Sequence, residues 1–180
     1  MDKWLIINGS PRINGKSARV VRLLMAALEH SQPQVGLELF EVASAQVEGC
    51  NGCAYCETAG TCIYQDDMAA LMQQLDQAQR VLMVMPVYFA GVPSQAKAVL
   101  DRMQPYFWEY LKRKRAGLPP AEKRPLALFV VGDGGDPHGF EPLVATVRSS
   151  MALAGFAIDE VVPLVGLKSI RREDLGKWGA

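Results

Sequence analysis

The sequence has no long apolar run and no surplus of charge of one sign. Lysine plus arginine and aspartate plus glutamate each number 19 among the 180 residues, so the formal net charge is zero. Proteins that bind nucleic acid or membrane surfaces usually carry a basic excess, so we expect neither partner. The first apolar run, residues 5–7, is far too short for a signal peptide or a spanning helix. We therefore expect a cytoplasmic protein.

Histidine is scarce, and internal repeats, linkers and low-complexity tracts are absent. The two histidines, His30 and His138, offer neither a catalytic triad nor a metal-binding pair. A chain of this length can bury a core without disulfides, and we expect one domain over residues 1–180.

Short apolar runs alternate with longer amphipathic stretches, a pattern typical of β–α units and a parallel sheet. Strands are expected at residues 4–7, 37–42, 81–85, 126–131 and 156–164. Helices are expected at 17–30, 66–78, from 94 onward and at 141–154, with a short tail over 167–180. The pattern predicts an α/β fold with a doubly wound, five-stranded parallel sheet. If the strand order is 2-1-3-4-5, a ligand binds beyond strands one, three and four.

The segment Asn8 to Ser17 is a polar, glycine-containing loop between the first strand and the first helix. Such a loop directs backbone N–H groups toward one point beside the positive end of a helix dipole, which favours phosphate. The candidate ligands are Ser10, Arg12, Asn14, Gly15, Lys16 and Ser17. A Walker A loop would need glycine where Ser10 stands, and Gly-x-Gly-x-x-Gly is absent. A P-loop nucleotide hydrolase and a plain helix-capping turn remain weaker alternatives.

The order Gly9-Ser10-Pro11-Arg12, followed by Gly15-x-Ser17, resembles the phosphate loop of the NADPH-dependent FMN reductase and flavodoxin-like flavoprotein superfamily. The resemblance implies a flavodoxin-like fold in which this loop holds the phosphate of FMN. It also implies NAD(P)H as electron donor and assembly into a homodimer or homotetramer.

The loops after strands three and four extend the resemblance. Pro86-Val87-Tyr88-Phe89, followed by a helix with Lys97 and Asp101-Arg102, is similar to the family's flavin loop. The two aromatic residues offer the planar surface that an isoalloxazine ring needs, although they could equally pack into the core. Gly132-Asp133-Gly134 lies where the family borders the flavin ring. The resemblance therefore implies that all seven of these loop residues bind FMN.

Four cysteines lie within thirteen residues: Cys50, Cys53, Cys56 and Cys62 form Cys-x2-Cys-x2-Cys-x5-Cys. The close spacing lets one loop wrap a 4Fe–4S cluster, whereas zinc more often uses two separated Cys-x2-Cys pairs. With the following Asp66-Asp67, the motif resembles that of the iron–sulfur flavoproteins, a branch of this superfamily. The resemblance implies a cluster near the flavin. Thiols without a metal remain an alternative, because other relatives carry similar cysteines.

These observations favour an FMN-dependent NAD(P)H oxidoreductase of the flavin or quinone reductase type, acting on a small-molecule electron acceptor. The alternative is an iron–sulfur flavoprotein that carries electrons between redox proteins. The basic run Lys112 to Arg115 is interpreted as a solvated helix end, with the preceding aromatic residues at a dimer contact.

Overall fold

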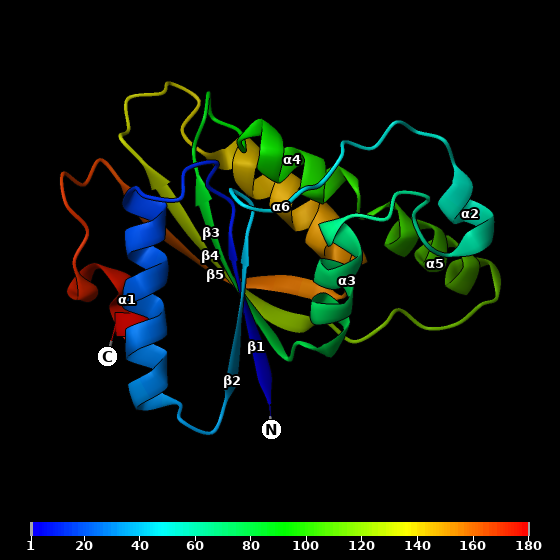
Figure 1. Ribbon diagram of the computed structural model, residues 1–180, viewed down its shortest axis with the longest axis horizontal. Helices are drawn as coiled ribbons and strands as arrows, with labels where there is room; N and C mark the ends of the chain where they lie inside the picture. Colours follow the sequence, from blue (N-terminus) through cyan, green and yellow to red (C-terminus); the bar gives the residue numbers. More distant parts are fainter. Residues whose placement is uncertain (1, 180) are drawn as a thin grey trace.

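A parallel sheet forms the centre of the computed structural model, which describes residues 2–179 (Figure 1). Its strands within these residues are β1 (Lys3–Asn8), β2 (Gly36–Glu41), β3 (Arg80–Pro86), β4 (Arg124–Gly132) and β5 (Phe156–Val165). Their order is β2-β1-β3-β4-β5, and every neighbouring pair is parallel. The doubly wound sheet and its strand order are therefore confirmed.

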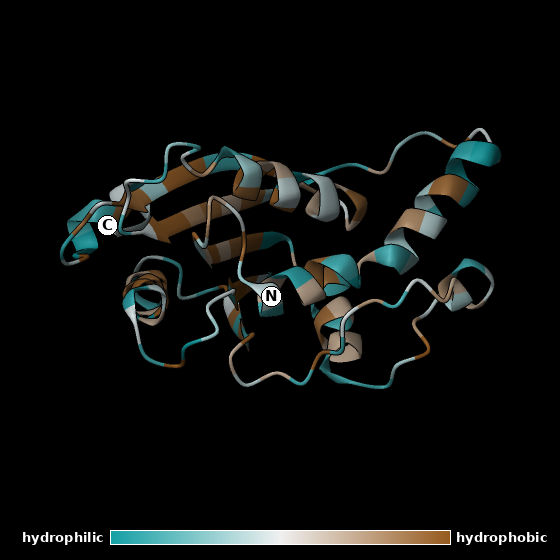
Figure 2. Cartoon of the chain, turned by 90° about the horizontal axis from the view of Figure 1, so that it is seen from above, coloured by the Kyte–Doolittle hydropathy of each residue, from teal (hydrophilic) through white to brown (hydrophobic). Residues whose placement is uncertain are grey.

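Helices cover both faces of this sheet. They are α1 (Lys16–Ser31), α2 (Tyr55–Ala59), α3 (Asp67–Gln77), α4 (Ser94–Asp101), α5 (Gln104–Arg115), α6 (Glu141–Leu153) and the 3₁₀ segment η1 (Arg172–Gly179). In Figure 2 the apolar strands lie between two helical layers, while α5 and the segment with α2 project from one side.

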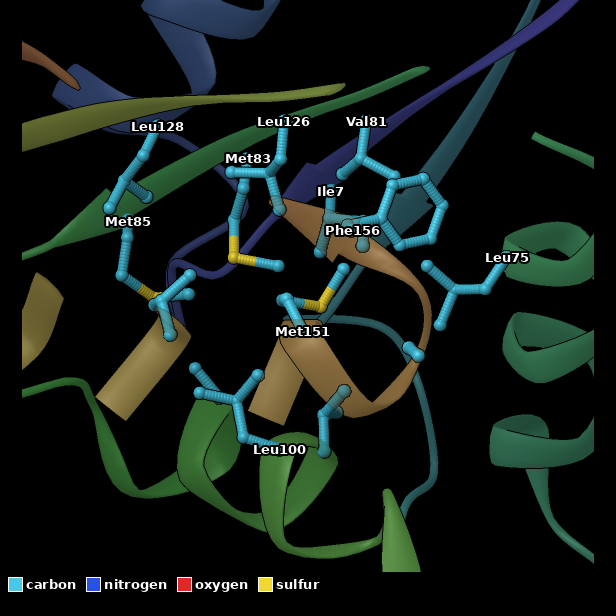
Figure 3. Packing of buried hydrophobic residues seen from close by; sticks show 14 of the residues in the cluster. Ile7, Leu75, Val81, Met83, Met85, Leu100, Leu126, Leu128, Met151 and Phe156 are labelled. Carbon is cyan, nitrogen blue, oxygen red and sulfur yellow. The ribbon is translucent and has the colours of Figure 1, made fainter. Parts of the chain in front are cut away.

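The alternation of side chains along the central strands builds two separate cores. Ile6 and Leu82 point to the face covered by α1 and η1. Leu5, Ile7 and Met83 point to the opposite face, which α3, α4 and α6 cover. Figure 3 shows this larger core, where methionine and leucine side chains from the strands meet those of the helices. Burial on both faces explains why the central strands are apolar almost throughout.

The start of α3 agrees with the sequence. Asp66 is the N-cap, and its carboxylate accepts a hydrogen bond from the backbone N–H of Met68 at 3.1 Å. This interaction satisfies a donor that the first helical turn leaves free.

The segment after β5 differs from the expected short tail, because η1 packs against the sheet. Trp178 is buried, stacks edge-to-face on Trp4 and Phe129, and donates from Nε1 to Glu160 at 2.9 Å. The apolar side chains of Ile170, Leu175 and Trp178 cover sheet surface that α1 leaves open. Among residues 2–179, no helix combines the length and apolar composition that crossing a membrane requires.

Candidate functional site

Three loops meet at the edge of the sheet where β1, β3 and β4 end (Figure 1). Gly9 N donates to Val84 O at 2.8 Å, which fixes the loop after β1 beside β3. Leu143 N donates to Ala90 O at 3.1 Å, which ties the loop after β3 to the first turn of α6. Adjacent parallel strands bring their carboxyl ends to one edge, so the loops that we expected to share a site do lie together.

The loop after β1 leads into a helix end that has no side-chain cap. Gly15 is the N-cap of α1 in an extended conformation, and no side chain of the described residues caps the first turn. The first backbone N–H groups of a helix have no partner within it, so this end of α1 can bind an anion. Ser17 lies buried in this first turn, whereas Arg12 and Asn14 are exposed on the loop.

Two of the expected phosphate ligands make other contacts. Ser10 is buried, and its Oγ accepts from Arg12 N at 3.1 Å, so this hydroxyl shapes the loop. Lys16 Nζ lies 2.5 Å from Asp133 Oδ1 and 2.9 Å from Leu167 O. The hydrogen bond from Lys16 lowers the pKa of Asp133 below its usual value. Lys16 thus links the loop after β1 to the loop after β4.

The loop after β3 holds an aromatic side chain outward. Tyr88 and Gly91 exchange two backbone hydrogen bonds of 2.9 Å, and the residues between them have positive φ, 50° at Phe89 and 60° at Ala90. Two central residues with positive φ define a tight type I′ geometry that non-glycine residues seldom adopt. The Phe89 side chain is 99% exposed, which excludes the alternative that it packs into the core.

A cavity of about 340 Å³ lies between the loops after β3 and β4. Five expected site residues line it: Val87, Phe89, Gly132, Asp133 and Gly134. Pro86 is buried where β3 ends, and Tyr88 is exposed and is not among the residues that line the cavity.

Phe140 and Val165 also line this cavity and were not predicted from the sequence. The strand order could have indicated Val165, because it ends β5, the neighbour of β4. The arrangement suits FMN, since the uncapped helix end can hold a phosphate while glycines and an exposed aromatic ring offer a slot for a planar group.

A second cavity, of about 370 Å³, is lined by all four cysteines. Cys56 lies on α2 and is buried, while Cys50 and Cys53 are exposed and all four are free thiols. Burial raises the pKa of the Cys56 thiol, and the three neighbouring cysteines raise it further. The fold therefore brings all four cysteines of the motif to the wall of one cavity.

The loop that carries the cysteines is closed at its base. Asp66 Oδ2 accepts from Glu48 N at 3.1 Å, and Gln46 N donates to Asp67 Oδ2 at 2.7 Å. Arg102, which follows α4, donates to both carboxylate oxygens of Asp66, at 2.7 and 3.0 Å, and to Glu48 O at 2.8 Å. Burial alone would raise the pKa of Asp66, but the hydrogen bonds from Arg102 and the backbone lower it below its usual value.

The cysteines are the residues that could hold an iron–sulfur cluster, since four free thiols line one cavity. Within residues 2–179, no three histidine, cysteine, aspartate or glutamate side chains are gathered closely enough to hold one metal ion. A four-iron cluster is larger, and each of its cysteines binds a different iron. Four free thiols around one cavity match that requirement in chemistry and in number.

Comparison with known proteins shows the family to which the chain belongs. Residues 3–165 match the family model of NADPH-dependent FMN reductase. An iron–sulfur flavoprotein of Archaeoglobus fulgidus is 34% identical over 100 residues, covering 56% of this chain and 44% of the relative. Iron–sulfur flavoprotein MJ1083 of Methanocaldococcus jannaschii is 30% identical over 115 residues, covering 64% and 58%. The chain spans about half the length of these curated relatives.

Solved structures share the fold at low sequence identity. An FMN-dependent NADH-azoreductase from Bacillus anthracis, in complex with FMN, superposes with a TM-score of 0.65 at 14% identity, covering 99% of this chain and 94% of that one. Smu.1420 from Streptococcus mutans gives 0.66 at 10% identity, covering 98% and 94%. These neighbours confirm the flavodoxin-like architecture. Because the family model covers far more than half of its residues, the chain belongs to the NADPH-dependent FMN reductase family.

Proposed function

We propose that the protein is an FMN-dependent NAD(P)H oxidoreductase. The observation that carries the proposal is the uncapped start of α1 at the same edge of the sheet as the exposed Phe89 and the cavity between the loops after β3 and β4. Family membership supports it, as do the names of structural neighbours, which include an azoreductase and an NADH:FMN oxidoreductase.

The protein's own groups would bind and orient the cofactor. The first turn of α1, with Ser17 and Arg12, would hold the phosphate, and Tyr88 and Phe89 would border the ring together with Gly132 and its neighbours. Bound FMN supplies the ability to accept a hydride and release electrons to an acceptor. The loops would hold the nicotinamide against the flavin ring and exclude water between them.

The test is FMN binding followed by turnover. Purified protein titrated with FMN should quench flavin fluorescence at a one-to-one ratio, and the complex should oxidise NADH or NADPH with a quinone or free flavin as acceptor. ATP hydrolysis in the presence of Mg²⁺ serves as the control for the nucleotide hydrolase alternative. A protein that takes up no FMN would contradict the proposal.

A second candidate, an iron–sulfur flavoprotein acting as an electron carrier between redox proteins, is favoured by the four cysteines around one cavity. The curated relatives named iron–sulfur flavoproteins support it. In the cytoplasm, where we place the protein, free thiols remain reduced and available as ligands. Anaerobic reconstitution with iron and sulfide should give about four irons per chain, with a broad visible band. Flavin without iron would leave the oxidoreductase alone.

We also propose a homodimer or homotetramer. The exposed side chain of Tyr110, on the projecting helix α5, is aromatic surface that a second copy would cover. Light scattering coupled to size-exclusion chromatography measures the assembly, and a monomer at micromolar concentration would contradict this proposal.

A further inference from the structure

A buried cation lines the wall of the cysteine cavity. The side chain of Arg102 is only 1% exposed and borders the same cavity as Cys50, Cys53, Cys56 and Cys62. Arginine is almost never buried so completely without partners, because removing its charge from water is unfavourable. Its position therefore needs an explanation.

The partners of Arg102 leave part of its guanidinium free. The two terminal nitrogens donate to Asp66 and to Glu48 O, and the ring of Tyr64 lies 4.9 Å from the guanidinium carbon. The Nε–H is buried and has no partner among the described residues. Burial alone would lower the pKa of Arg102, but its hydrogen bond to Asp66 and the nearby Cys62 raise it. The group stays charged.

Two carboxylates lie near the arginine at this cavity, and Asp66 offsets part of its charge. Asp66 faces it from the base of the loop with a side chain 12% exposed. Asp101 also borders the cavity, but its side chain is half-exposed and pairs with Lys97 at 2.6 Å. Among the described residues that line the cavity, Arg102 is the one cation, and its own side chain is shielded from water, where a charge acts strongly.

Four thiolates and a cluster core form an anion, and reduction makes that anion more negative. A fixed cation beside the site stabilises the reduced state more than the oxidised state, because the attraction grows with the added negative charge. The charges and hydrogen bonds around a cluster are among the factors that set its reduction potential.

We propose that Arg102 raises the reduction potential of the iron–sulfur cluster held by the four cysteines. This inference rests on the iron–sulfur function proposed above. Arg102 supplies the positive charge, its Nε–H is a buried donor without a partner among the described residues, and Asp66 holds the guanidinium in place while offsetting part of its charge. The cluster is thereby easier to reduce, which favours electron flow into it from a reduced flavin.

The test compares charge variants of the reconstituted full-length protein by anaerobic redox titration with dithionite, followed by visible absorption and electron paramagnetic resonance. Arg102→Gln removes the cation and should lower the equilibrium constant for one-electron reduction at least tenfold, about 59 mV. Asp66→Asn leaves the cation less neutralised and should shift the potential in the opposite direction. Arg102→Lys keeps the charge and should stay close to the unaltered protein.

Arg80→Gln is the matched control. Arg80 also forms an ion pair, with Asp159 at 3.0 Å, but it does not line the cysteine cavity. Its replacement should leave the potential unchanged. Loosening of the loop would expose the cluster to water in Arg102→Gln and Asp66→Asn alike, and would move both potentials in the same direction.

Each outcome bears on a different statement. A loaded cluster with opposite shifts in Arg102→Gln and Asp66→Asn supports the role of Arg102. A loaded cluster whose potential is unchanged in Arg102→Gln, or moves the same way in both variants, overturns that role alone. If Arg102→Gln takes up no cluster, the other two variants test the role of Arg102. A raised potential in Asp66→Asn with an unchanged potential in Arg102→Lys supports it, and an unchanged or lowered potential in Asp66→Asn overturns it. Unaltered protein that takes up no iron overturns the cluster and the role of Arg102 together.

Discussion

Phe89 shows how a single residue can carry strain without contributing to the folded core. Its side chain contacts little of its own chain, and its φ of 50° lies in a region that non-glycine residues seldom occupy. Unusual backbone of this kind tends to occur at binding sites, where the surrounding structure holds it in place. Here the Tyr88–Gly91 hydrogen bonds do so.

Phe89→Ala should therefore separate binding from stability. We expect the free energy of unfolding of the FMN-free protein to change by less than about 0.5 kcal/mol, because an exposed side chain buries no surface. The affinity for FMN should fall, since the ring loses an apolar neighbour. Chemical denaturation and fluorescence titration measure the two effects. Leu118→Ala, another exposed apolar residue, is the control, and equal loss of FMN affinity in both variants would count against this role of Phe89.

Ser17 allows a second prediction at the same scale. Its hydroxyl lies in the first turn of α1, beside N–H groups that no side chain caps. Ser17→Ala should lower FMN affinity about tenfold, the effect of removing one hydrogen bond to a charged phosphate. Ser31→Ala is the matched control, because Ser31 lies at the opposite end of α1 and bonds to Ala27 O. Unchanged affinity in Ser17→Ala would place the phosphate elsewhere.

At the scale of elements, the start of α3 joins helix capping to closure of the cysteine loop. Asp66 caps the helix, accepts from Glu48 N and pairs with Arg102. The sequence predicts the cap, because an aspartate precedes a helical pattern. It does not predict the pair, because Arg102 lies 36 residues away and only the packing of α4 brings it there.

The lowered pKa of Asp66 makes stability depend on pH. The ionised form stabilises the fold above the pKa of an unfolded aspartate, about 4, and this stabilisation is lost as the pH falls through the lower pKa of the folded state. Asp66→Asn should be less stable at neutral pH by about 1.5–3 kcal/mol, with a smaller further loss on acidification. Denaturation at pH 3 to 7 measures both curves. Parallel curves would show that Asp66 contributes nothing to acid sensitivity.

At the scale of the whole molecule, η1 completes the second face of the sheet. Trp178 joins residues from β1, β4 and β5 through Trp4, Phe129 and Glu160. Arg80, at the start of β3, stacks over both Trp4 and Trp178, with its guanidinium carbon 5.6 and 5.2 Å from the two rings. Distant parts of the chain therefore depend on one aromatic side chain.

Trp178→Ala should destabilise the protein by about 3–5 kcal/mol, the usual cost of deleting a large buried aromatic side chain. Trp178→Phe keeps an apolar ring and loses the hydrogen bond to Glu160, so its loss should be closer to 1 kcal/mol. Denaturant titration followed by circular dichroism measures both. Equal stability of the alanine variant and the unaltered protein would mean that η1 is dispensable.

The sequence predicted the sheet because its central strands are buried on both faces and read as continuous apolar runs. The expected strand at residues 81–85 became β3, one residue longer at each end. The three loops were predicted from their glycine-rich and aromatic sequences and from the family resemblance, and the strand order explains why they meet at one edge. Helices α2 and α5 were harder to predict, because they pack against each other and beside a cavity and contribute little to either core. Phe140 and Arg102 were not assigned roles because their positions depend on tertiary packing.

The tie between Asp66, Glu48 and Arg102 makes the cysteine segment a module. No residue between 48 and 66 belongs to either core. The segment contacts the rest of the molecule through α2 on α5 and through Tyr64 on Arg102, and its ends are joined by hydrogen bonds. A shorter connection could replace it while β2 and α3 kept their places. In evolution, a segment whose two ends are joined in this way can be gained, lost or moved to a related fold in one genetic step, leaving the sheet and its other loops as they are.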